Sequence, residues 1–494
     1  MTPHTSDTNP LRIASLPFGG GGGVLGLTFA PGKQQRDGAT AWHRRDLGTD
    51  LDAIAAWNAA VVVTLVEEHE LDALGIADIG SEVRRRHMEW HHWPIGDYQV
   101  PGTAFMAAWP KRSAMLRGVM ARGGRVLVHC KGGLGRAGSV AARLLVEDGI
   151  LADAAIAAVR AARPDAIETP GQAAWVVAGR PAPLPEPDRS RMAARDRAVG
   201  ALLGLAVGDA LGAAIEFEPK PLFVRVDDLR AGGPHRLKRG EWTDDTAMAM
   251  ALAESLAADP GLDADDLMRR FLDWFDTGAY SCTGKCFDIG MQTRAALERY
   301  RRSGVALAGS DDPAASGNGA LMRLAPVAIR HWRTREALAR VADRQTRTTH
   351  GSPETLAASA AFASMLADAI EGVGLGAILA RPEAEAVDWR GLRRDAVEGS
   401  GYVLRSLQAA MWAVSRSTDF RSAVLLAANL GQDADTTAAI AGQLAGAVYG
   451  AAGIPAEWLD AVAWRDRLAE LSGNLFDAAW PDDDVGAGSV PACV

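Results

Sequence analysis

Residues 431–437 read Gly-Gln-Asp-Ala-Asp-Thr-Thr and lead directly into a run of small apolar residues, AAIAGQLAGAVY, at 438–449. This pattern is typical of a helix start, and it brings two carboxylates and two hydroxyls together in one turn of chain. Oxygen ligands of this kind suit Mg²⁺ or Mn²⁺, whereas zinc sites favour nitrogen and sulfur. Helix capping would explain a single such carboxylate, because Asp and Thr are favoured at helix N-termini. The stretch is therefore either a capped helix start or half of a metal site.

The same chemistry recurs at residues 242–246, Trp-Thr-Asp-Asp-Thr, which open a second apolar helix pattern, AMAMALAESLA. Two helix caps this rich in Asp and Thr are less expected by chance than two helix N-termini that converge on one metal centre. The sequence therefore predicts a divalent-cation site built from two segments that lie far apart in the chain.

Length and charge indicate two domains. A chain of 494 residues is long for one core. Residues 1–190 hold 20 Lys+Arg and 20 Asp+Glu, so the net charge of −9 falls on residues 191–494, where the cations would bind. No basic block favours a nucleic-acid-binding face, so nucleic acid is at most a small substrate.

Cysteine usage and apolar runs indicate the compartment. Four cysteines are too few and too scattered for a disulfide framework, which predicts a reducing cytoplasm. The N-terminal residues do not resemble a secretion signal, and no apolar run is long enough for a membrane span. We therefore expect a soluble cytoplasmic protein without a membrane partner.

The first part of the chain has the pattern of an α/β domain. Residues 61–66 (VVVTLV) and 125–129 (RVLVH) are predicted as buried strands, with helical patterns between them, so a mostly parallel sheet is expected. The glycine run at 19–23 is interpreted as a flexible loop, because no acidic residue follows at the distance that a dinucleotide-binding fingerprint requires.

The second predicted strand runs into His-Cys-Lys-Gly-Gly-Leu-Gly-Arg-Ala-Gly at 129–138, followed by an apolar helix pattern. A strand, a glycine-rich turn and a helix start form a ring of backbone amides that binds a tetrahedral oxyanion. Cys130 in that ring is expected to be a thiolate, and Arg136 can grip a phosphate with two donors. The remaining predicted phosphate-binding residues are Lys131, Gly132, Gly133, Leu134 and Gly135.

With this loop the chain resembles the cysteine-dependent dual-specificity phosphatases, in particular the cyclin-dependent kinase inhibitor 3-like branch. Residues 93–101 (WPIGDYQVP) are similar to the general-acid loop of that family, which would make Asp97 the proton donor. Residues 163–170 are similar to its closing segment. The family usually has Ser or Thr after the arginine, whereas this chain has Ala137, and Ser139 is two residues late. The alternative is a phosphate-binding reader with little turnover.

The rest of the chain divides into a linker, a helical domain and a tail. Residues 179–190 are proline-rich and are predicted to be a stiff linker between domain 1–178 and domain 191–480, with a tail at 481–494. The second domain is predicted to be all-α. Residues 197–217 are predicted as a central helix that carries two acids, Asp209 and Glu216. A nearby metal centre would provide the partner that a buried carboxylate needs, and a supporting or capping role for Asp209 is the alternative.

This domain resembles the ADP-ribosylglycohydrolases, and its Cys-Phe-Asp-Ile-Gly segment is most similar to the branch that reactivates dinitrogenase reductase. The stretches that carry the resemblance are 204–216, 242–246, 286–290, 317–323, His350 near Glu354, and 431–437. The resemblance implies an all-helical fold with two divalent cations, Mg²⁺ or Mn²⁺, in an ADP-ribose cleft. One ion would be held by Thr243, Asp244, Asp245 and Asp435, and the other by Asp433, Asp435 and Thr436.

By the same resemblance Glu216 would be the substrate-gripping or proton-handling acid. Ser316, Gly317, Asn318, Gly319 and His350 would bind the substrate. The chain is thus expected to be a multidomain hydrolase that releases ADP-ribose from a protein side chain or a small molecule, with a phosphorylated substrate for its first domain. A catalytically dead structural relative, like the lens crystallins that resemble this family, is the remaining alternative. The acceptor that bears the ADP-ribose stays open.

Overall fold

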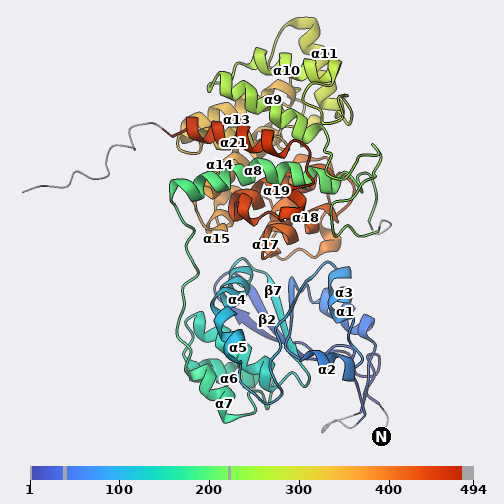
Figure 1. The fold of residues 1–494 in the computed structure, drawn as a ribbon, viewed down its shortest axis with the longest axis vertical. Helices are drawn as coiled ribbons and strands as arrows, with labels where there is room; N and C mark the ends of the chain where they lie inside the picture. The colour runs from blue at the N-terminus through green and yellow to red at the C-terminus, as the bar shows by residue number, and fades with distance from the viewer. Residues whose placement is uncertain (1–2, 37–41, 221–223, 386, 481–494) are drawn as a thin grey trace, which may run out of the picture. The chain divides into compact units, whose positions relative to one another are not determined.

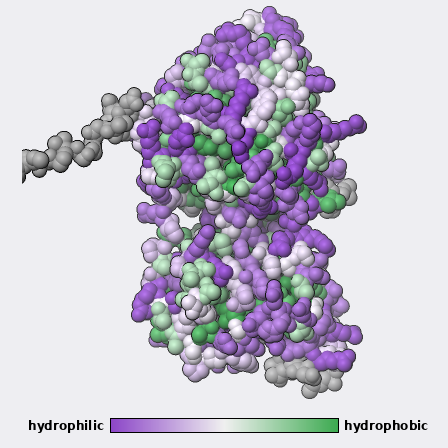
Figure 2. Space-filling model, in the orientation of Figure 1, coloured by the Kyte–Doolittle hydropathy of each residue, from purple (hydrophilic) through white to green (hydrophobic). Residues whose placement is uncertain are grey.

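The computed structural model describes residues 3–36, 42–220, 224–385 and 387–480, so the predicted tail at 481–494 lies outside the described residues. The chain divides into two compact units (Figure 1). The N-terminal unit comprises Met1–Pro185 with Arg390–Ala396 and Ser415–Thr418, and the C-terminal unit comprises the remainder. No described helix is both long and apolar enough to span a membrane. Figure 2 shows hydrophilic residues over much of one face of each unit, with smaller apolar areas between them.

The N-terminal unit is built on a five-stranded sheet of order β1-β2-β7-β5-β6. Its strands are β1 (Ala14–Phe18), β2 (Gly23–Phe29), β5 (Val61–Thr64), β6 (Glu89–His92) and β7 (Arg125–Cys130). All neighbours pair in parallel except β1 and β2, so the predicted mostly parallel sheet is present. A separate two-stranded sheet joins β3 (Gln34–Gln35) to β4 (His43–Arg44).

Helices flank this sheet. Figure 1 shows α4 (Thr103–Ala121) and α5 (Gly135–Glu147) on one side of β2 and β7, with α1 (Leu47–Ala56) and α3 (Ile79–Arg85) on the other. The remaining helices are α2 (Glu68–Ala73), α6 (Ala152–Ala162) and α7 (Pro170–Val177). Every residue of β5 is buried, as its Val-rich sequence predicts.

The glycine run at 19–23 differs from the flexible loop that was expected. Residues 19–22 form the turn of the antiparallel β1–β2 hairpin, and Gly23 pairs with Phe18. Gly19 and Gly22 have φ values of 57° and 77°, a region that glycine adopts without strain. The run therefore connects two strands that were not predicted, because their sequences show no clear alternation of apolar and polar residues.

The C-terminal unit is helical, and over the described ranges it contains no strand. Its longer helices are α8 (Arg191–Gly212), α9 (Asp244–Ala258), α10 (Ala264–Thr277), α11 (Met291–Ser303), α12 (Ala325–His331), α13 (Arg335–Thr349), α14 (Pro353–Glu371), α17 (Val403–Arg416), α18 (Phe420–Ala428), α19 (Ala434–Tyr449) and α21 (Arg465–Ala478). The short helices are α15 (Leu375–Leu379), α16 (Pro382–Glu385) and α20 (Ala456–Leu459).

Helices α8 and α19 lie against each other at backbone distance. Gly204 and Gly208 of α8 face the carbonyls of Gly442 and Ala438 on α19, where a Cβ would collide with the backbone. Because the two helices run antiparallel, Gly212 at the end of α8 meets Ala434 at the start of α19. The small residues that the sequence shows in both helices therefore set the position of the α19 N-terminus.

Helix α8 ends at Gly212, five residues before the predicted end at Phe217. Glu216 consequently lies in the segment after the helix and not on its surface. That segment is fixed to the start of α19: the Phe217 amide donates to the Gln432 carbonyl at 2.6 Å, and the Gln432 amide donates to the Glu218 carbonyl at 2.8 Å. Glu216 is thereby brought to the helix start that carries Asp433 and Asp435.

Candidate active sites

The two predicted acidic stretches meet. Thr243 precedes α9 and Asp433 precedes α19, so both stretches lie at helix N-termini, as predicted. The Thr243 hydroxyl donates to the Asp435 carboxylate at 3.2 Å. From the other side, the Thr436 hydroxyl donates to the Asp245 carboxylate at 3.2 Å. All predicted metal-ligating residues thus lie in one buried cluster, although each contact joins residues far apart in sequence.

Asp209 of α8 caps α9. Its carboxylate accepts hydrogen bonds from the Thr243 amide at 2.8 Å, the Thr246 amide at 3.1 Å and the Thr246 hydroxyl at 2.6 Å. Burial raises the pKa of Asp209 to about 6, while these bonds lower it. These bonds show the capping role that was one of the alternatives for Asp209.

Two triads of carboxylates share Asp435. Oxygens of Glu216, Asp433 and Asp435 lie within 4.8 Å of one another, as do oxygens of Asp244, Asp288 and Asp435. Asp288 was not predicted as a site residue, although it is the central residue of the Cys286–Gly290 segment. We call the six carboxylates the acidic cluster: Glu216, Asp244, Asp245, Asp288, Asp433 and Asp435.

The acidic cluster carries more negative charge than the fold neutralises. Burial and then repulsion from neighbouring carboxylates raise the pKa of Asp244, Asp245 and Asp435 well above that of an ordinary aspartate. The same causes raise the pKa of Glu216 to about 10. Oδ2 of Asp245 and Oδ1 of Asp435 are buried and accept no hydrogen bond. Buried oxygens without donors fit hard divalent cations, which are bound by such atoms.

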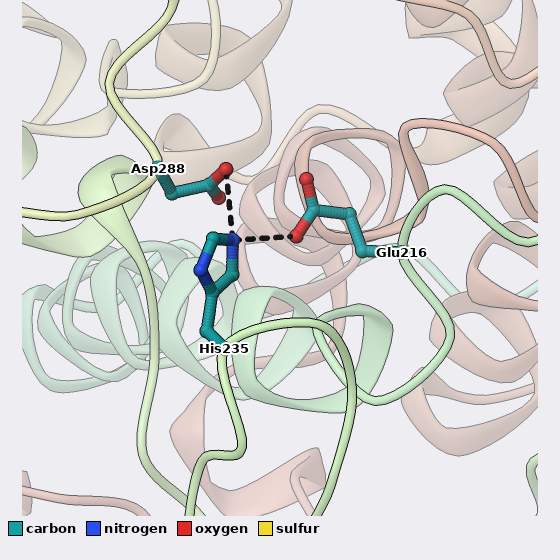
Figure 3. Close-up of side chains that lie close together, drawn as sticks. All are labelled: Glu216, His235 and Asp288. Carbon is teal, nitrogen blue, oxygen red and sulfur yellow. Dashed lines mark ion pairs between the residues drawn. The ribbon is translucent and has the colours of Figure 1, made fainter.

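His235 touches the acidic cluster from the loop before α9. Its Nε2 lies 3.1 Å from Oδ1 of Asp288 and 3.3 Å from Oε2 of Glu216 (Figure 3). The rings of Phe217 and Phe287 lie beside the imidazole, with centroids at 6.5 Å and 5.0 Å. No sequence signal marked His235, because its position depends on the path of an irregular loop.

The predicted substrate-binding residues lie beside the acidic cluster. The Asn318 side-chain amide donates to the Asp433 carboxylate at 2.6 Å. The His350 ring fills the space next to two glycines, since a Cβ at Gly319 would lie 2.8 Å from it and one at Gly317 would lie 3.1 Å from it. Burial lowers the pKa of His350 to about 3, so the ring is neutral. The Ser316 hydroxyl bonds to Pro313 and Ser352, so it supports the loop.

The second candidate site lies in the N-terminal unit, where β7 ends at Cys130 and α5 begins at Gly135. The predicted phosphate-binding residues 131–134 form the loop between them. Arg136 is buried and donates to both carboxylate oxygens of Glu70, at 2.5 and 3.0 Å, and to the Ile95 carbonyl at 3.0 Å. Asp97 lies 2.9 Å from the same guanidinium.

Glu70 was missed by sequence reasoning. Burial alone would raise the pKa of Glu70, but its bonds to Arg136 and to the Glu67 amide lower it below the ordinary value. Glu70 is therefore a carboxylate that fixes the guanidinium in one orientation. Arg163 was also missed, although it lies in the quoted segment 163–170: it donates to the carbonyls of Gly133 and Gly132 at 3.3 and 3.0 Å and braces the loop.

The position after Arg136 offers no hydroxyl. Ala137 is completely buried, and the Ser139 hydroxyl donates to the Arg136 carbonyl at 3.0 Å. Ser139 therefore supports α5 and does not replace the missing hydroxyl.

Comparison with known proteins identifies a family for each of the two units. The model of the ADP-ribosylglycohydrolase family matches residues 190–484, and that of the "Swiss Army Knife protein, DSP-PTPase phosphatase domain" matches residues 40–176. The ADP-ribosylarginine hydrolase Tri1 of Pseudomonas putida is 42% identical over 303 residues, which cover 60% of this chain and 81% of that protein. The ADP-ribosyl-[dinitrogen reductase] glycohydrolase of Rhodospirillum rubrum is 36% identical over 270 residues, 53% of this chain and 89% of that protein.

A solved structure described as an ADP-ribosylglycohydrolase-related protein complex is 42% identical, with a TM-score of 0.52 over 58% of this chain and 99% of that chain. The matches cover the helical unit with its acidic cluster, and the phosphatase match covers the loop that holds Cys130 and Arg136. Both resemblances expected from the sequence are confirmed. The chain therefore belongs to the ADP-ribosylglycohydrolase family, with a phosphatase domain of the dual-specificity type joined to its N-terminal side.

Proposed function

We propose that the C-terminal unit hydrolyses the N-glycosidic bond between ADP-ribose and an arginine side chain. The observation that carries this proposal is the pair of carboxylates, Glu216 and Asp288, that converge on one nitrogen of His235. A guanidinium presents a planar fork of N–H donors that matches paired carboxylates. The relatives named above act on ADP-ribosylarginine and on ADP-ribosylated dinitrogen reductase, as their names state.

The divalent cations belong to the same proposal. Mg²⁺ or Mn²⁺ would be held by Thr243, Asp244, Asp245, Asp433, Asp435 and Thr436, with Asp435 shared between the two triads. Paired cations of this type orient oxygen ligands and lower the pKa of a bound water. The proposal is supported by the unbonded buried oxygens of Asp245 and Asp435.

The chain's own residues bind and orient the substrate. The wall formed by Ser316–Gly319 and His350 receives the ribose and diphosphate, and its glycines leave room for the His350 ring. Glu216 and Asp288 hold the guanidinium after His235 has moved aside. Water attacks the anomeric carbon, the carbon–nitrogen bond breaks, and the guanidine leaves with its electron pair. We assign Glu216 the proton of that exchange, which it takes from the attacking water and returns to the leaving guanidine.

The test is release of ADP-ribose from arginine-linked and serine-linked ADP-ribosyl peptides, in Mg²⁺, in Mn²⁺ and in chelator. We expect release from the arginine peptide alone, which chelator and Asp433→Ala each abolish. Asp466→Asn, an exposed position in the same unit, is the matched control and should act like wild type. Release from the serine peptide would contradict the acceptor, and release in chelator would contradict the metal dependence.

For the N-terminal unit we propose phosphate-monoester hydrolysis. The Cys130 sulfur attacks phosphorus, a P–S bond forms, the P–O bond to the leaving group breaks, and Asp97 donates a proton to the leaving oxygen. Water then attacks phosphorus, the sulfur departs as a thiolate, and the Asp97 carboxylate takes the proton of the water. Arg136, which Glu70 holds in place, binds the phosphoryl oxygens throughout.

A phosphate-binding reader remains the second candidate, and Ala137 is the observation that favours it. Hydrolysis of p-nitrophenyl phosphate by wild type and Cys130→Ser separates the two. Turnover that requires Cys130 and survives chelator would support the enzyme. Binding of phosphorylated ligands by both forms without turnover would support the reader.

We also propose the domain boundaries and the cellular compartment of the protein. We place the domain boundaries at 1–178 and 191–480, with residues 179–190 as the linker, because residues 180–189 form neither helix nor strand. We place the protein in the cytoplasm, because Cys130, Cys282 and Cys286 are free thiols and the proposed chemistry of Cys130 needs a reducing environment.

A further inference from the structure

Lys33 is a buried lysine beside the phosphate-binding loop, with only 5% of its surface exposed. It lies just beyond β2, which pairs with β7 so that Phe29 stands opposite Cys130. Its Nζ donates to the carbonyl of Lys131 at 3.4 Å and lies 5.0 Å from the centre of the Phe29 ring. The ammonium thus contacts the residue that follows Cys130 and the residue that pairs with it.

Within the part of the chain that the structure describes, which leaves out residues 37–41, Lys33 forms no ion pair with a carboxylate. Burial lowers the pKa of Lys33 to about 8, the Cys130 sulfur raises it, and the cations Arg163, Arg45 and Lys131 lower it further. The neighbouring Arg45, by contrast, is paired with both oxygens of Asp50, at 2.7 and 2.8 Å. A buried ammonium is costly without an anion. Among the groups named here, the Cys130 sulfur is the one that favours the charged form of Lys33.

The chemistry of the site lacks one component that Lys33 can supply. When water attacks the phosphocysteine, the P–S bond breaks and the sulfur takes the electron pair, so negative charge develops on sulfur. The position after Arg136 is Ala137, and the Ser139 hydroxyl is bonded to the Arg136 carbonyl. No hydroxyl of these two residues can therefore stabilise the departing sulfur.

We propose that Lys33 is the electrostatic partner of the Cys130 thiolate and takes the part of the hydroxyl that position 137 lacks. The ammonium transfers no proton; it stabilises the charge that builds up on sulfur. Lys33 precedes residues 40–176, so it lies outside the region that matches the phosphatase family. The part that Lys33 plays in turnover rests on the phosphatase function proposed above, whereas its pairing with the Cys130 thiolate does not.

Alkylation of Cys130 tests the pairing without any need for turnover. In the full chain, the rate of reaction with iodoacetamide is measured against pH for wild type, Lys33→Met and Lys33→Arg, with Cys130→Ser to identify the modified residue. An opposite charge close to an ionisable group shifts its ionisation by about 1 to 3 pH units. We expect the midpoint of alkylation to rise by about 1 unit or more in Lys33→Met, while Lys33→Arg stays close to wild type.

The matched control is Lys111→Met, which removes the same charge from an exposed position of α4. The other charged or titratable groups around the pair are unchanged in every variant; they are Arg136, Glu70, Asp97, Lys131, Arg163, Arg45, Asp50, His43 and His129. Thermal unfolding shows whether each variant is folded. An alkylation midpoint in folded Lys33→Met that equals that of wild type and of Lys111→Met would overturn the proposal.

Turnover tests the second half of the proposal. Ala137→Ser restores a hydroxyl, so the loss of p-nitrophenyl phosphate turnover caused by Lys33→Met should be severalfold smaller in the Ala137→Ser background than in wild type. Equal losses in both backgrounds would refute the replacement of the hydroxyl. If wild type shows no turnover at all, the proposed phosphatase function fails, and the alkylation result still decides whether Lys33 pairs with the thiolate.

Discussion

Replacing Asp435 by Asn should change stability in opposite directions with and without divalent cation. Asp435 belongs to both carboxylate triads, and it is almost completely buried. In chelator, the substitution removes one negative charge from a cluster that repels itself. The new amide oxygen can still accept the hydrogen bond of Thr243, so packing is preserved. With metal present, the same substitution removes a shared ligand.

The size of the effect follows from the spacing of the oxygens. Two unit charges at most 4.8 Å apart repel by at least about 3.5 kcal/mol at an effective dielectric constant of about 20. Proton uptake by the cluster relieves part of this repulsion, so we expect Asp435→Asn to stabilise the chelated protein by about 1 to 3 kcal/mol. For a large domain 1 kcal/mol corresponds to about 2 to 4 °C in the unfolding midpoint. Metal at about one hundred times its dissociation constant should stabilise wild type by about 2.7 kcal/mol, and the variant by much less.

Calorimetric unfolding of the full chain in chelator and in saturating Mg²⁺ or Mn²⁺ measures both effects. The transition that responds to metal in wild type is the one to compare. Asp466→Asn, whose side chain is 89% exposed, controls for the loss of one negative charge and should leave both transitions in place. If Asp435→Asn lowers the midpoint in chelator, or if metal stabilises the variant as much as wild type, the acidic cluster is not the cation site.

Three further predictions concern single side chains. Glu70→Gln should destabilise the N-terminal unit by about 3 kcal/mol, because it leaves buried Arg136 without its bidentate partner. Urea unfolding measures this loss, and an unchanged unfolding midpoint would show that Asp97 alone is enough to balance the charge of Arg136. Burial lowers the pKa of His129 from 6.5 to about 3, so the unfolded chain takes up a proton below pH 6.5 that the folded one refuses. The free energy of unfolding that His129 contributes is complete above pH 6.5 and falls by about 1.4 kcal/mol per pH unit below it. In urea titrations at several pH values, His129→Gln should therefore weaken the dependence of the free energy of unfolding on pH. An unchanged dependence would show that other groups cause it. His235→Ala should lower the KM for arginine-linked ADP-ribose by up to about tenfold at unchanged kcat, because it removes an imidazole that occupies the space between Glu216 and Asp288; a higher KM would show instead that the imidazole binds substrate.

The sequence predicted those parts of the sites whose chemistry is local. Asp244, Asp245 and Asp435 stand in the first turn of a helix and Asp433 directly precedes one, so their neighbours in the chain reveal them. The strand and loop that hold Cys130 are equally continuous, and the strands expected at 61–66 and 125–129 are present with slightly different ends.

Residues whose roles depend on distant partners were not predictable in this way. Glu70 is a site residue only because the fold carries α2 to Arg136, and His235 only because its loop returns to Asp288. The predicted end of helix α8 was wrong for a related reason. Residues 213–217 remain apolar and helix-compatible in sequence, but the contact of Gly212 with Ala434 and the hydrogen bonds at Gln432 take the chain in another direction.

The two units bury charge of opposite sign, and this explains how one chain can keep two hydrolytic sites apart. The acidic cluster in the C-terminal unit has unbonded carboxylate oxygens and attracts cations. The loop around Cys130 gathers Arg136, Arg163 and Lys33, and it attracts anions. The same contrast is visible in the even charge of residues 1–190 and the excess of −9 beyond them. Because neither kind of ligand suits the other site, the proposed glycohydrolase chemistry would depend on metal and the proposed phosphatase chemistry would not.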